Sequence, residues 1–195
     1  DVICKTCPFF WLAYDTGGNT LLAASQKKGQ VLQITSQRPI LDADLAADDS
    51  LCYLSSESGY RAVLYVYNSS QELIYRWLSS SQFFLRCTVS GGANYAAAAA
   101  LGQQDGMFES SVVLFRTDSE EIYRTIPIGN DLIYDLHFVS DSLLAVLCEN
   151  DLYFYDLEGQ KQGSYSFQSS YLKDFTADGS GFLTLAVNLY KAGNR

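Results

Sequence analysis

Short apolar stretches separated by polar turns recur along most of the chain. In the clearest interval, residues 132–139, 143–148, 152–157 and 163–167 are apolar. The breaks between them are Ser140-Asp141, Glu149-Asn150 and Glu158-Gly159. These dipeptides favour turns, and short runs bounded by turn residues are typical of β-strands. The pattern predicts four antiparallel strands in this interval.

The same layout repeats along the sequence. The strand that precedes a polar turn and a second apolar run begins at Asp44, Arg86, Asp135 and Asp174, and these anchors lie 42, 49 and 39 residues apart. A period of roughly 40 to 50 residues is typical of one four-stranded propeller blade. We therefore predict an all-β fold, a β-propeller with WD40-like or YVTN-like antiparallel blades.

The repeat divides residues 1–195 into units of one propeller region. We expect complete blades at residues 42–82, 83–130 and 131–170, a shorter first unit at 9–41, and the start of a further blade at 171–195. A propeller must seal its ring to hide its strand edges. The chain is therefore predicted to be a section of a larger ring, unless its two incomplete ends pair to close a four-bladed one.

The second repeat contains two unusual stretches. Residues 96–100 are consecutive alanines. Alanine favours helix, but the run fills the position of a second strand, so we predict a strand where neighbouring blades crowd together. Residues 102–110 are predicted to form a long loop that exposes Met107 and Phe108. Loops carry function more often than strands do, although Phe108 could instead cover the blade edge.

Composition and charge narrow the function classes. Aromatic residues make up 14% of the chain, with only 3 Pro, which suits strands. The net charge of −9 argues against nucleic acid as a partner, because like charges repel. No apolar run approaches the roughly 20 residues that cross a bilayer. No signal peptide is visible at the N-terminus.

Cysteine and histidine offer few catalytic options. Cys52, Cys87 and Cys148 lie in apolar strand patterns and are predicted to be buried thiols. Cys4 and Cys7 have the spacing of half a zinc site or a redox pair, but no second pair completes four ligands. His137 is the only histidine, and we predict a hydrogen-bonded structural role for it, with the potential to sense pH.

Carboxylates and one tryptophan remain as candidates. Asp42, Asp44, Asp48 and Asp49 form the densest acidic group and could offer oxygen ligands to calcium, but we favour a solvated turn. Trp77, at a fourth-strand position, could stack on a sugar or a quinone, but packing between blades is the preferred interpretation. The motifs of serine hydrolases, nucleotide-binding loops and zinc proteases are absent from the sequence. We expect no catalytic residue, metal site or cofactor.

Four stretches resemble an uncharacterised clostridial β-propeller family of unknown function, DUF5711. They are Tyr14-Asp15-Thr16-Gly17-Gly18 and residues 58–67, 72–77 and 109–115. The resemblance implies an exported propeller anchored by one N-terminal membrane helix, in a Gram-positive bacterium, with further blades on both sides of this chain. It assigns no catalytic residue. Residues 90–94 depart from the Asp-containing turn that is usual there.

The leading functional hypothesis is a non-catalytic, exported binding or scaffold propeller of the bacterial cell envelope. Its partner would be a protein, a peptide or a cell-wall glycan, with no nucleic acid, and it would meet the membrane only through a helix absent from this chain. The candidate contact residues are Tyr60, Met107 and Phe108. They lie between second and third strands of consecutive blades, and we expect them at the same end of the ring.

The alternative is a carbohydrate-active hydrolase or lyase that uses carboxylates near the central channel, because glycoside hydrolysis needs only two of them at a set separation. Ionisable groups that converge at one channel mouth would favour this enzyme. Scattered, solvated carboxylates would favour the binding module.

Overall fold

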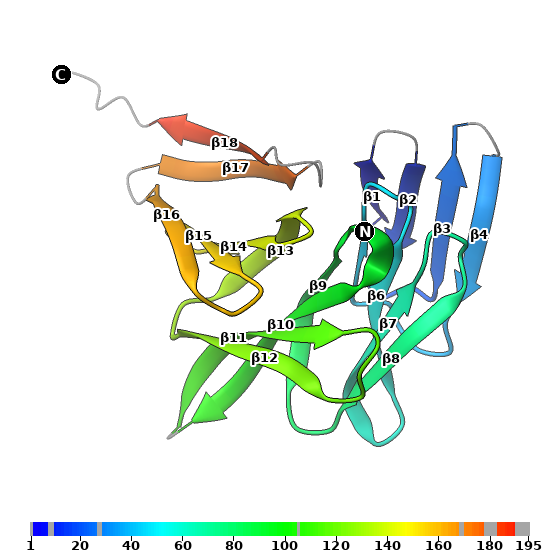
Figure 1. The fold of residues 1–195 in the computed structure, drawn as a ribbon, viewed down its shortest axis with the longest axis horizontal. Helices are drawn as coiled ribbons and strands as arrows, with labels where there is room; N and C mark the ends of the chain where they lie inside the picture. Colours follow the sequence, from blue (N-terminus) through cyan, green and yellow to red (C-terminus); the bar gives the residue numbers. More distant parts are fainter. Residues whose placement is uncertain are drawn as a thin grey trace.

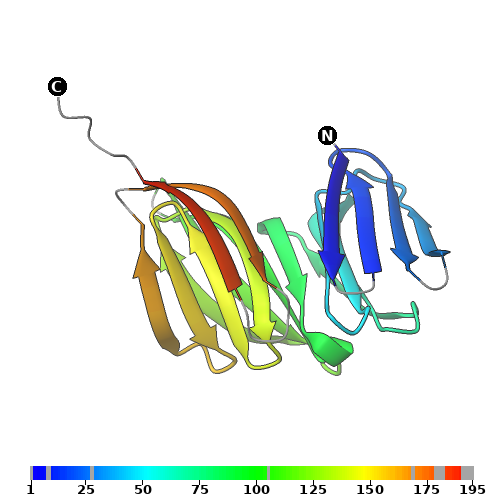
Figure 2. The same ribbon diagram turned by 90° about the horizontal axis from the view of Figure 1, so that it is seen from above.

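The chain folds almost entirely into antiparallel β-strands (Figure 1). The computed structural model describes residues 2–7, 10–26, 29–104, 106–167, 170–177 and 183–189. Its sheets lie face to face around an axis, as Figure 2 shows, and each blade is built from strands that are consecutive in sequence. The predicted all-β propeller is confirmed.

Three complete sheets occupy the intervals where the repeat predicted them. Blade 2 contains β5 (Asp42–Leu45), β6 (Leu51–Glu57), β7 (Tyr60–Tyr67) and β8 (Leu73–Ser79). Blade 3 contains β9 (Phe83–Val89), β10 (Tyr95–Gln104), β11 (Met107–Arg116) and β12 (Ile122–Gly129). Blade 4 contains β13 (Ile133–Ser140), β14 (Leu143–Cys148), β15 (Asp151–Asp156) and β16 (Lys161–Ser166). A two-stranded sheet follows, formed by β17 (Ser170–Ala177) and β18 (Leu183–Leu189).

Blade 1 is larger than the sequence pattern suggested. It contains β1 (Val2–Cys7), β2 (Phe10–Asp15), β3 (Thr20–Ser25) and β4 (Gly29–Thr35). The expected shorter unit at residues 9–41 lacked β1, which pairs along its full length with β2 and completes a four-stranded sheet. The prediction was wrong on this point because Lys5 and Thr6 break the apolar pattern of β1.

Apolar side chains fill the spaces between adjacent blades. Four buried clusters lie between blades 1 and 2, between blades 2 and 3, between blades 3 and 4, and between blade 4 and the β17–β18 sheet. Stacking buries both faces of an inner blade, which explains why its strands are apolar on both sides. Hydrophobic contact between sheets is therefore the main source of stability for this fold.

The alanine run shows how closely the blades approach. Ala96, Ala98 and Ala100 belong to the cluster between blades 2 and 3, whereas Ala97 and Ala99 belong to the cluster between blades 3 and 4. Side chains alternate between the two faces of a strand, so β10 presents a methyl group to each neighbour in turn. The predicted strand is confirmed, and blade crowding explains why small residues occupy it.

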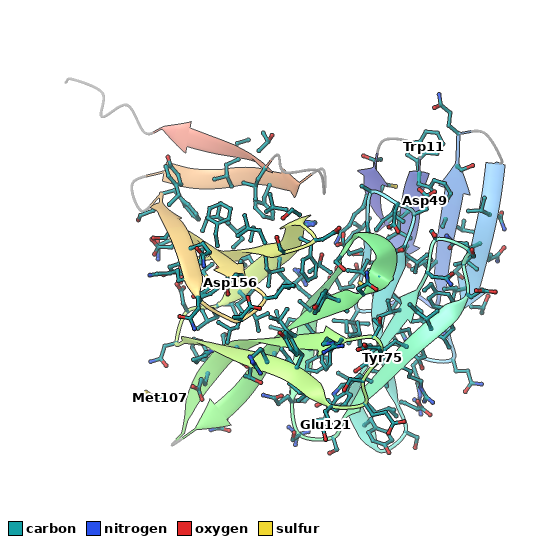
Figure 3. All side chains as sticks on the ribbon, in the orientation of Figure 1. Trp11, Asp49, Tyr75, Met107, Glu121 and Asp156 are labelled. Atoms are coloured by element: carbon teal, nitrogen blue, oxygen red, sulfur yellow. The ribbon has the colours of Figure 1, made fainter. Side chains whose placement is uncertain are left out.

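The segment after this run is not the long loop that we expected at residues 102–110. β10 and β11 stay paired without a break out to Gln104 and Met107. Gly106, directly before β11, adopts a φ of +82°, which favours glycine. Met107 and Phe108 thus lie on a protruding strand hairpin, and Figure 3 shows Met107 at the edge of the molecule.

The departure at residues 90–94 produces a short 3-10 turn, Gly91–Ala93, between β9 and β10. The Asp48 carboxylate of blade 2 accepts a hydrogen bond of 2.7 Å from the Gly92 N–H. The turn of blade 2 that contains Asp48 therefore binds the 3-10 turn of blade 3.

Candidate functional site

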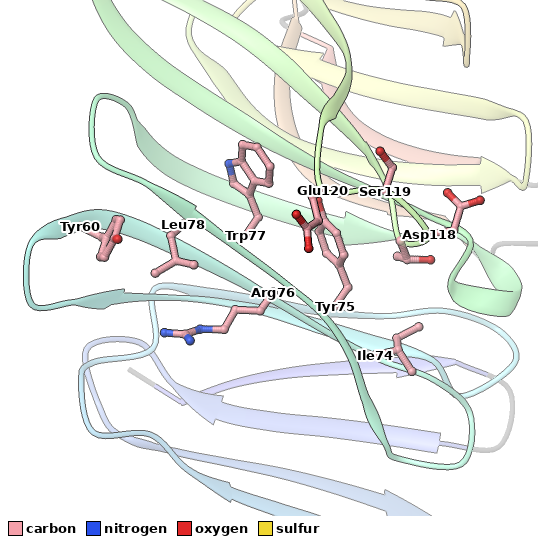
Figure 4. Close-up of a pocket in the computed structure, with 10 residues that line it drawn as sticks. Tyr60, Ile74, Tyr75, Arg76, Trp77, Leu78, Asp118, Ser119 and Glu120 are labelled. Carbon is pink, nitrogen blue, oxygen red and sulfur yellow. The ribbon is translucent and has the colours of Figure 1, made fainter.

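A groove of about 650 Å³ runs between blades 2 and 3 (Figure 4). One wall consists of residues 74–78 of β8, and the other is the β11–β12 turn at residues 117–120. Tyr60 lies at one end, near Leu78. Side chains of successive strand residues point to opposite faces of the sheet. Five successive residues of β8 line this groove, so the groove faces the edge of the strand and not one face of the sheet. β8 is the last strand of its sheet, and this edge has no partner strand in the described structure.

Aromatic side chains form the floor of this groove. Trp77 is partly buried and its ring centroid lies 5.4 Å from that of Phe115 in blade 3, so the predicted packing role between blades is confirmed. Tyr75 contacts the same ring at 6.2 Å. Its hydroxyl is buried and has no hydrogen-bond partner in the part of the chain that the structure describes, and burial raises the pKa of Tyr75 to about 12.

Acidic groups predominate at the rim of the groove. Arg76 is paired with Glu57 of the β6–β7 hairpin, and Arg116 is paired with Asp118 at 2.6 Å. Glu120 on the opposite wall is exposed and has no cation within ion-pair distance among the described residues. Both arginines are already neutralised, and the groove therefore keeps an unmatched negative charge.

The predicted contact residues occupy two places. The turn before β7 and the turn before β11 join second and third strands of consecutive blades, as expected from the repeat. Tyr60, 42% exposed, lines the groove, whereas Met107 and Phe108, 60% and 48% exposed, stand on the β10–β11 hairpin and do not line it. The groove residues of β8 were not among the predicted contact residues, although Trp77 was considered as a stacking residue.

A second concentration of polar side chains lies where the first strands of the blades meet. Lys5 Nζ of β1 lies 3.6 Å from an Asp42 oxygen and 3.7 Å from an Asp44 oxygen of β5. His137 of β13 places Nδ1 3.7 Å from Asp44 and Nε2 3.4 Å from Asp135. We call Lys5, Asp42, Asp44, Asp135 and His137 the axial cluster.

Asp42 is the most extensively bound member of the axial cluster. Its carboxylate accepts hydrogen bonds of 2.8 Å from the Tyr14 hydroxyl and from the Cys87 N–H. The residue is only 3% exposed. Because Tyr14, Asp42 and Cys87 belong to three different blades, this one carboxylate joins blades 1, 2 and 3.

The axial environment changes the pKa of its members in opposite directions. Burial raises the pKa of Asp42, against the opposing effect of Lys5. Burial alone would also raise the pKa of Asp135, but the hydrogen bond and charge of His137, together with Lys5, lower it. Burial alone would lower the pKa of Lys5, but Asp44, Asp42 and Asp135 raise it well above its usual range.

The predictions for His137 and the acidic group can now be compared with their positions. His137 is partly buried beside two carboxylates, as expected for a structural histidine; burial lowers its pKa, but Asp44 and Asp135 outweigh that effect and raise it. Asp42 and Asp44 are buried at the axis, so the expected solvated turn was wrong for them. Asp48, by contrast, caps its turn by accepting a hydrogen bond of 3.1 Å from the Ser50 N–H.

The described residues offer no metal-ligand group, and the cysteines whose side chains are described are free thiols. No group of three or more His, Cys, Asp or Glu residues in it could hold a metal ion. Cys52, Cys87 and Cys148 are buried free thiols, as predicted, and Cys4 is an exposed free thiol on β1. The side chain of Cys7 lies outside the described residues. No helix in the described segments is long and apolar enough to cross a membrane.

A cavity of about 490 Å³ opens beside the axial cluster. Its lining includes Lys5, Asp42, Arg86 and Asp135. Ionisable groups therefore do converge near the axis, which is the arrangement that the sequence analysis named as favouring an enzyme. The same groups are also bound to one another and to the backbone, which is what a structural network requires.

Comparison with known proteins identifies the family and the fold. The model of a family of unknown function, DUF5711, matches residues 1–179. No curated protein matches the chain.

Solved structures share the fold at low sequence identity. Hydrazine synthase of Kuenenia stuttgartiensis superposes with a TM-score of 0.65 at 13% identity, over 97% of this chain and 56% of that one. KlHsv2 with loop 6CD replaced by a Gly-Ser linker gives a TM-score of 0.65 at 16% identity, over 95% of this chain and 62% of that one. The C-terminal WD40 domain of Sif2 gives 0.59 at 10% identity, over 92% and 52%. The chain thus spans between about half and two thirds of these proteins.

Proposed function

Because the chain belongs to DUF5711, a family to which no function is assigned, its role has to be inferred from its own surface, and we propose that it is a non-catalytic binding or scaffold propeller. The groove between blades 2 and 3 is the binding site in this proposal. The observation that carries it is the combination of exposed Tyr60 and Ile74 with partly buried Trp77 along an unpaired strand edge. Aromatic anchors in a pocket with a polar rim are typical of binding hot spots.

The proposed partner is a protein, a peptide or a cell-wall glycan. Both a peptide and a sugar can lie against aromatic rings, and the net charge of −9 disfavours polyanions. The proposed location is the outside of the bacterial membrane, as the family resemblance implies. Rigid blades would then present the groove without a large rearrangement.

The test compares two double variants that remove exposed apolar groups from different places. Tyr60→Ser with Ile74→Ser changes the groove, and Met107→Ser with Phe108→Ser changes the β10–β11 hairpin. Each folded protein is passed over purified cell-wall material and over immobilised membrane extract. The groove variant should lose retention while the hairpin variant keeps it. Equal retention of the groove variant and the unmodified protein would remove the groove from consideration.

One observation favours a second candidate, a hydrolase or lyase acting on carbohydrate. Asp42 and Asp135 line one cavity, and their surroundings move their pKa values in opposite directions. Such a separation is how paired carboxylates divide the roles of acid and base. Against it, the Asp42 carboxylate already binds Tyr14 and Cys87, and a reacting sugar would have to compete with these contacts.

The second candidate has its own test. The protein is incubated with purified peptidoglycan and with neutral polysaccharides, and the release of reducing ends is measured. Activity that is lost in a folded Asp135→Asn variant would support the enzyme. Absence of any release from the unmodified protein, at a pH both below and above neutrality, would leave the binding propeller as the better proposal.

A further inference from the structure

We propose that the groove receives an extended, positively charged polypeptide segment, which pairs with β8 as a fifth strand of blade 2. This inference rests on the proposed binding role and specifies its ligand. A strand at the edge of a sheet keeps a row of unpaired N–H and C=O groups that can bind another chain. Peptides that add to such an edge gain affinity from backbone hydrogen bonds and specificity from side-chain pockets.

β8 differs from the last strands of blades 3 and 4 in how its edge is protected, whereas β4, the last strand of blade 1, likewise contains no charged residue or proline. Edge strands are usually protected by charges or by proline. β12 carries Arg124 and Pro127, and β16 begins with Lys161. β8 reads Leu-Ile-Tyr-Arg-Trp-Leu-Ser, and its one charge, Arg76, is paired with Glu57 of its own blade. Apart from this pair, apolar side chains dominate the edge.

The opposite wall explains the preference for a basic segment. Among the described residues, Glu120 is exposed across the groove without a cation, while Asp118 is already paired with Arg116. A lysine or arginine on the added strand would supply the missing charge. The apolar residues next to this lysine or arginine would lie against Tyr60 and Trp77. The cation itself could also form a cation–π contact with one of these rings.

A second copy of this chain is a poorer occupant of the same edge. Two molecules that each carry a net charge of −9 repel one another. Pairing of β8 with another β8 would also bring a second Glu120 towards the groove instead of a cation. Electrostatic complementarity therefore selects a basic partner.

The test uses synthetic ten-residue peptides of defined chemistry. The parent peptide alternates valine and lysine, a second replaces each lysine with glutamate, and two more are N-methylated on the valines or on the lysines. Binding is followed by the fluorescence of Trp77 in a Trp11→Phe background, because the chain contains 2 Trp. Hydrogen exchange of residues 74–78 is measured in parallel, since an added strand protects amides on the edge.

The parent peptide should bind and slow the exchange of the β8 amides. The glutamate peptide and at least one N-methylated form should bind roughly tenfold more weakly, because each loses about 1.4 kcal/mol of charge or backbone interaction. Glu120→Lys should weaken binding of the parent peptide to a similar extent. Glu158→Lys is the matched control, since Glu158 is exposed in the corresponding β15–β16 turn of blade 4 and should have no effect.

Three results would overturn the inference. They are equal affinity of both N-methylated peptides and the parent, no binding of the parent peptide at about 1 mM, or a dimer that the Ile74→Lys variant converts to a monomer. The groove variant of the previous test separates the two proposals. If that variant loses retention on wall or membrane material while all peptides fail, the binding propeller stands and only the added-strand mode is wrong.

Discussion

The Asp42 carboxylate of the axial cluster and the groove beside β8 differ in how far their polar groups already have partners. At the axis, Asp42 is bound by Tyr14, Cys87 and Lys5, all from other blades. In the groove, Tyr75 has a hydroxyl without a partner and Glu120 has no cation among the described residues. Charge density alone would select the axis as the functional site.

The difference shows that unused binding capacity is a better guide to a ligand than the number of charges. Buried carboxylates that already bind donors from several blades stabilise the arrangement of those blades. Removing any one partner would leave an uncompensated charge inside the protein. Open backbone groups and exposed aromatic rings have no such role in the folded chain. Substitutions can separate the two cases, since Asp42→Ala should affect stability, whereas changes to the exposed groove residues Tyr60 and Ile74 should affect binding.

The largest effect is expected from Asp42→Ala. The substitution leaves the Tyr14 hydroxyl and the Cys87 N–H without an acceptor and removes one of the Lys5 partners, which should cost about 3–5 kcal/mol of unfolding free energy. Urea unfolding measures the loss. Asp118→Ala is the matched control at an exposed pair with Arg116 and should cost less than about 1 kcal/mol. Equal stability of both variants would remove the structural role of the axial cluster.

Trp77→Ala is expected to have the next largest effect. The indole packs against Phe115 but is only partly buried, so the loss should be about 2–3 kcal/mol, at or below the lower end of values for buried aromatic residues. Thermal unfolding measures it. Trp11 is 46% exposed, and Trp11→Ala should change the stability by less than about 1 kcal/mol. An unchanged melting temperature for Trp77→Ala together with lost binding would assign Trp77 to the ligand alone.

The pH dependence of stability should be smaller and should have a defined sign. His137 faces Asp44, Asp135, Lys5 and the ring of Phe175, and the net effect is a pKa raised from 6.5. A histidine with a raised pKa in the folded state stabilises fully below its unfolded pKa and loses that contribution as the pH rises through the folded value. The unfolding free energy should therefore fall as the pH increases above 6.5.

His137→Gln is the variant that tests this origin. It should flatten the fall in unfolding free energy above 6.5, as followed by urea unfolding at a series of pH values. A slope that persists unchanged in this variant would assign the pH dependence to another group.

The smallest effect is expected from Tyr75→Phe. Removal of a buried hydroxyl that has no partner among the described residues should raise the stability of the free protein by about 1 kcal/mol, because the unmet donor no longer has to be buried. Chemical unfolding measures the gain, and Tyr67→Phe is a control at a tyrosine whose hydroxyl interacts with that of Tyr53. A loss of stability in Tyr75→Phe would mean that the hydroxyl has a partner in solution.

The sequence predicted the blades better than it predicted their connections. Turn residues and apolar runs located the twelve strands of blades 2 to 4, because the pattern of a strand is local. It missed β1, in which Lys5 and Thr6 interrupt the apolar pattern, and it predicted a loop at residues 102–110 where β10 and β11 stay paired. In both cases the structure is decided by pairing with another strand. A local sequence pattern does not show which strands pair.

The candidate sites were predicted only in part, although the sequence contained a signal for the axis. Three of the four anchors that defined the repeat, Asp44, Arg86 and Asp135, are charged residues of the first strands of blades 2 to 4, and first strands surround the axis of a propeller. The recurrence of a charged residue in each first strand could have predicted that these side chains converge at the axis. The groove had no comparable signal, because Trp77 and Glu120 are 43 residues apart and meet only through the packing of two blades.

The sequence by itself determined the strand content, the repeat and the alternation of apolar residues, since these depend on neighbours within a few positions along the chain. Only the tertiary structure decided which charges are neutralised and which strand edge lines a groove. Lys5 meets Asp42 because blades 1 and 2 adjoin at the axis, and β8 lines a groove because the β11–β12 turn of blade 3 forms the opposite wall. These properties depend on distances between blades, and such distances are set by packing rather than by local sequence.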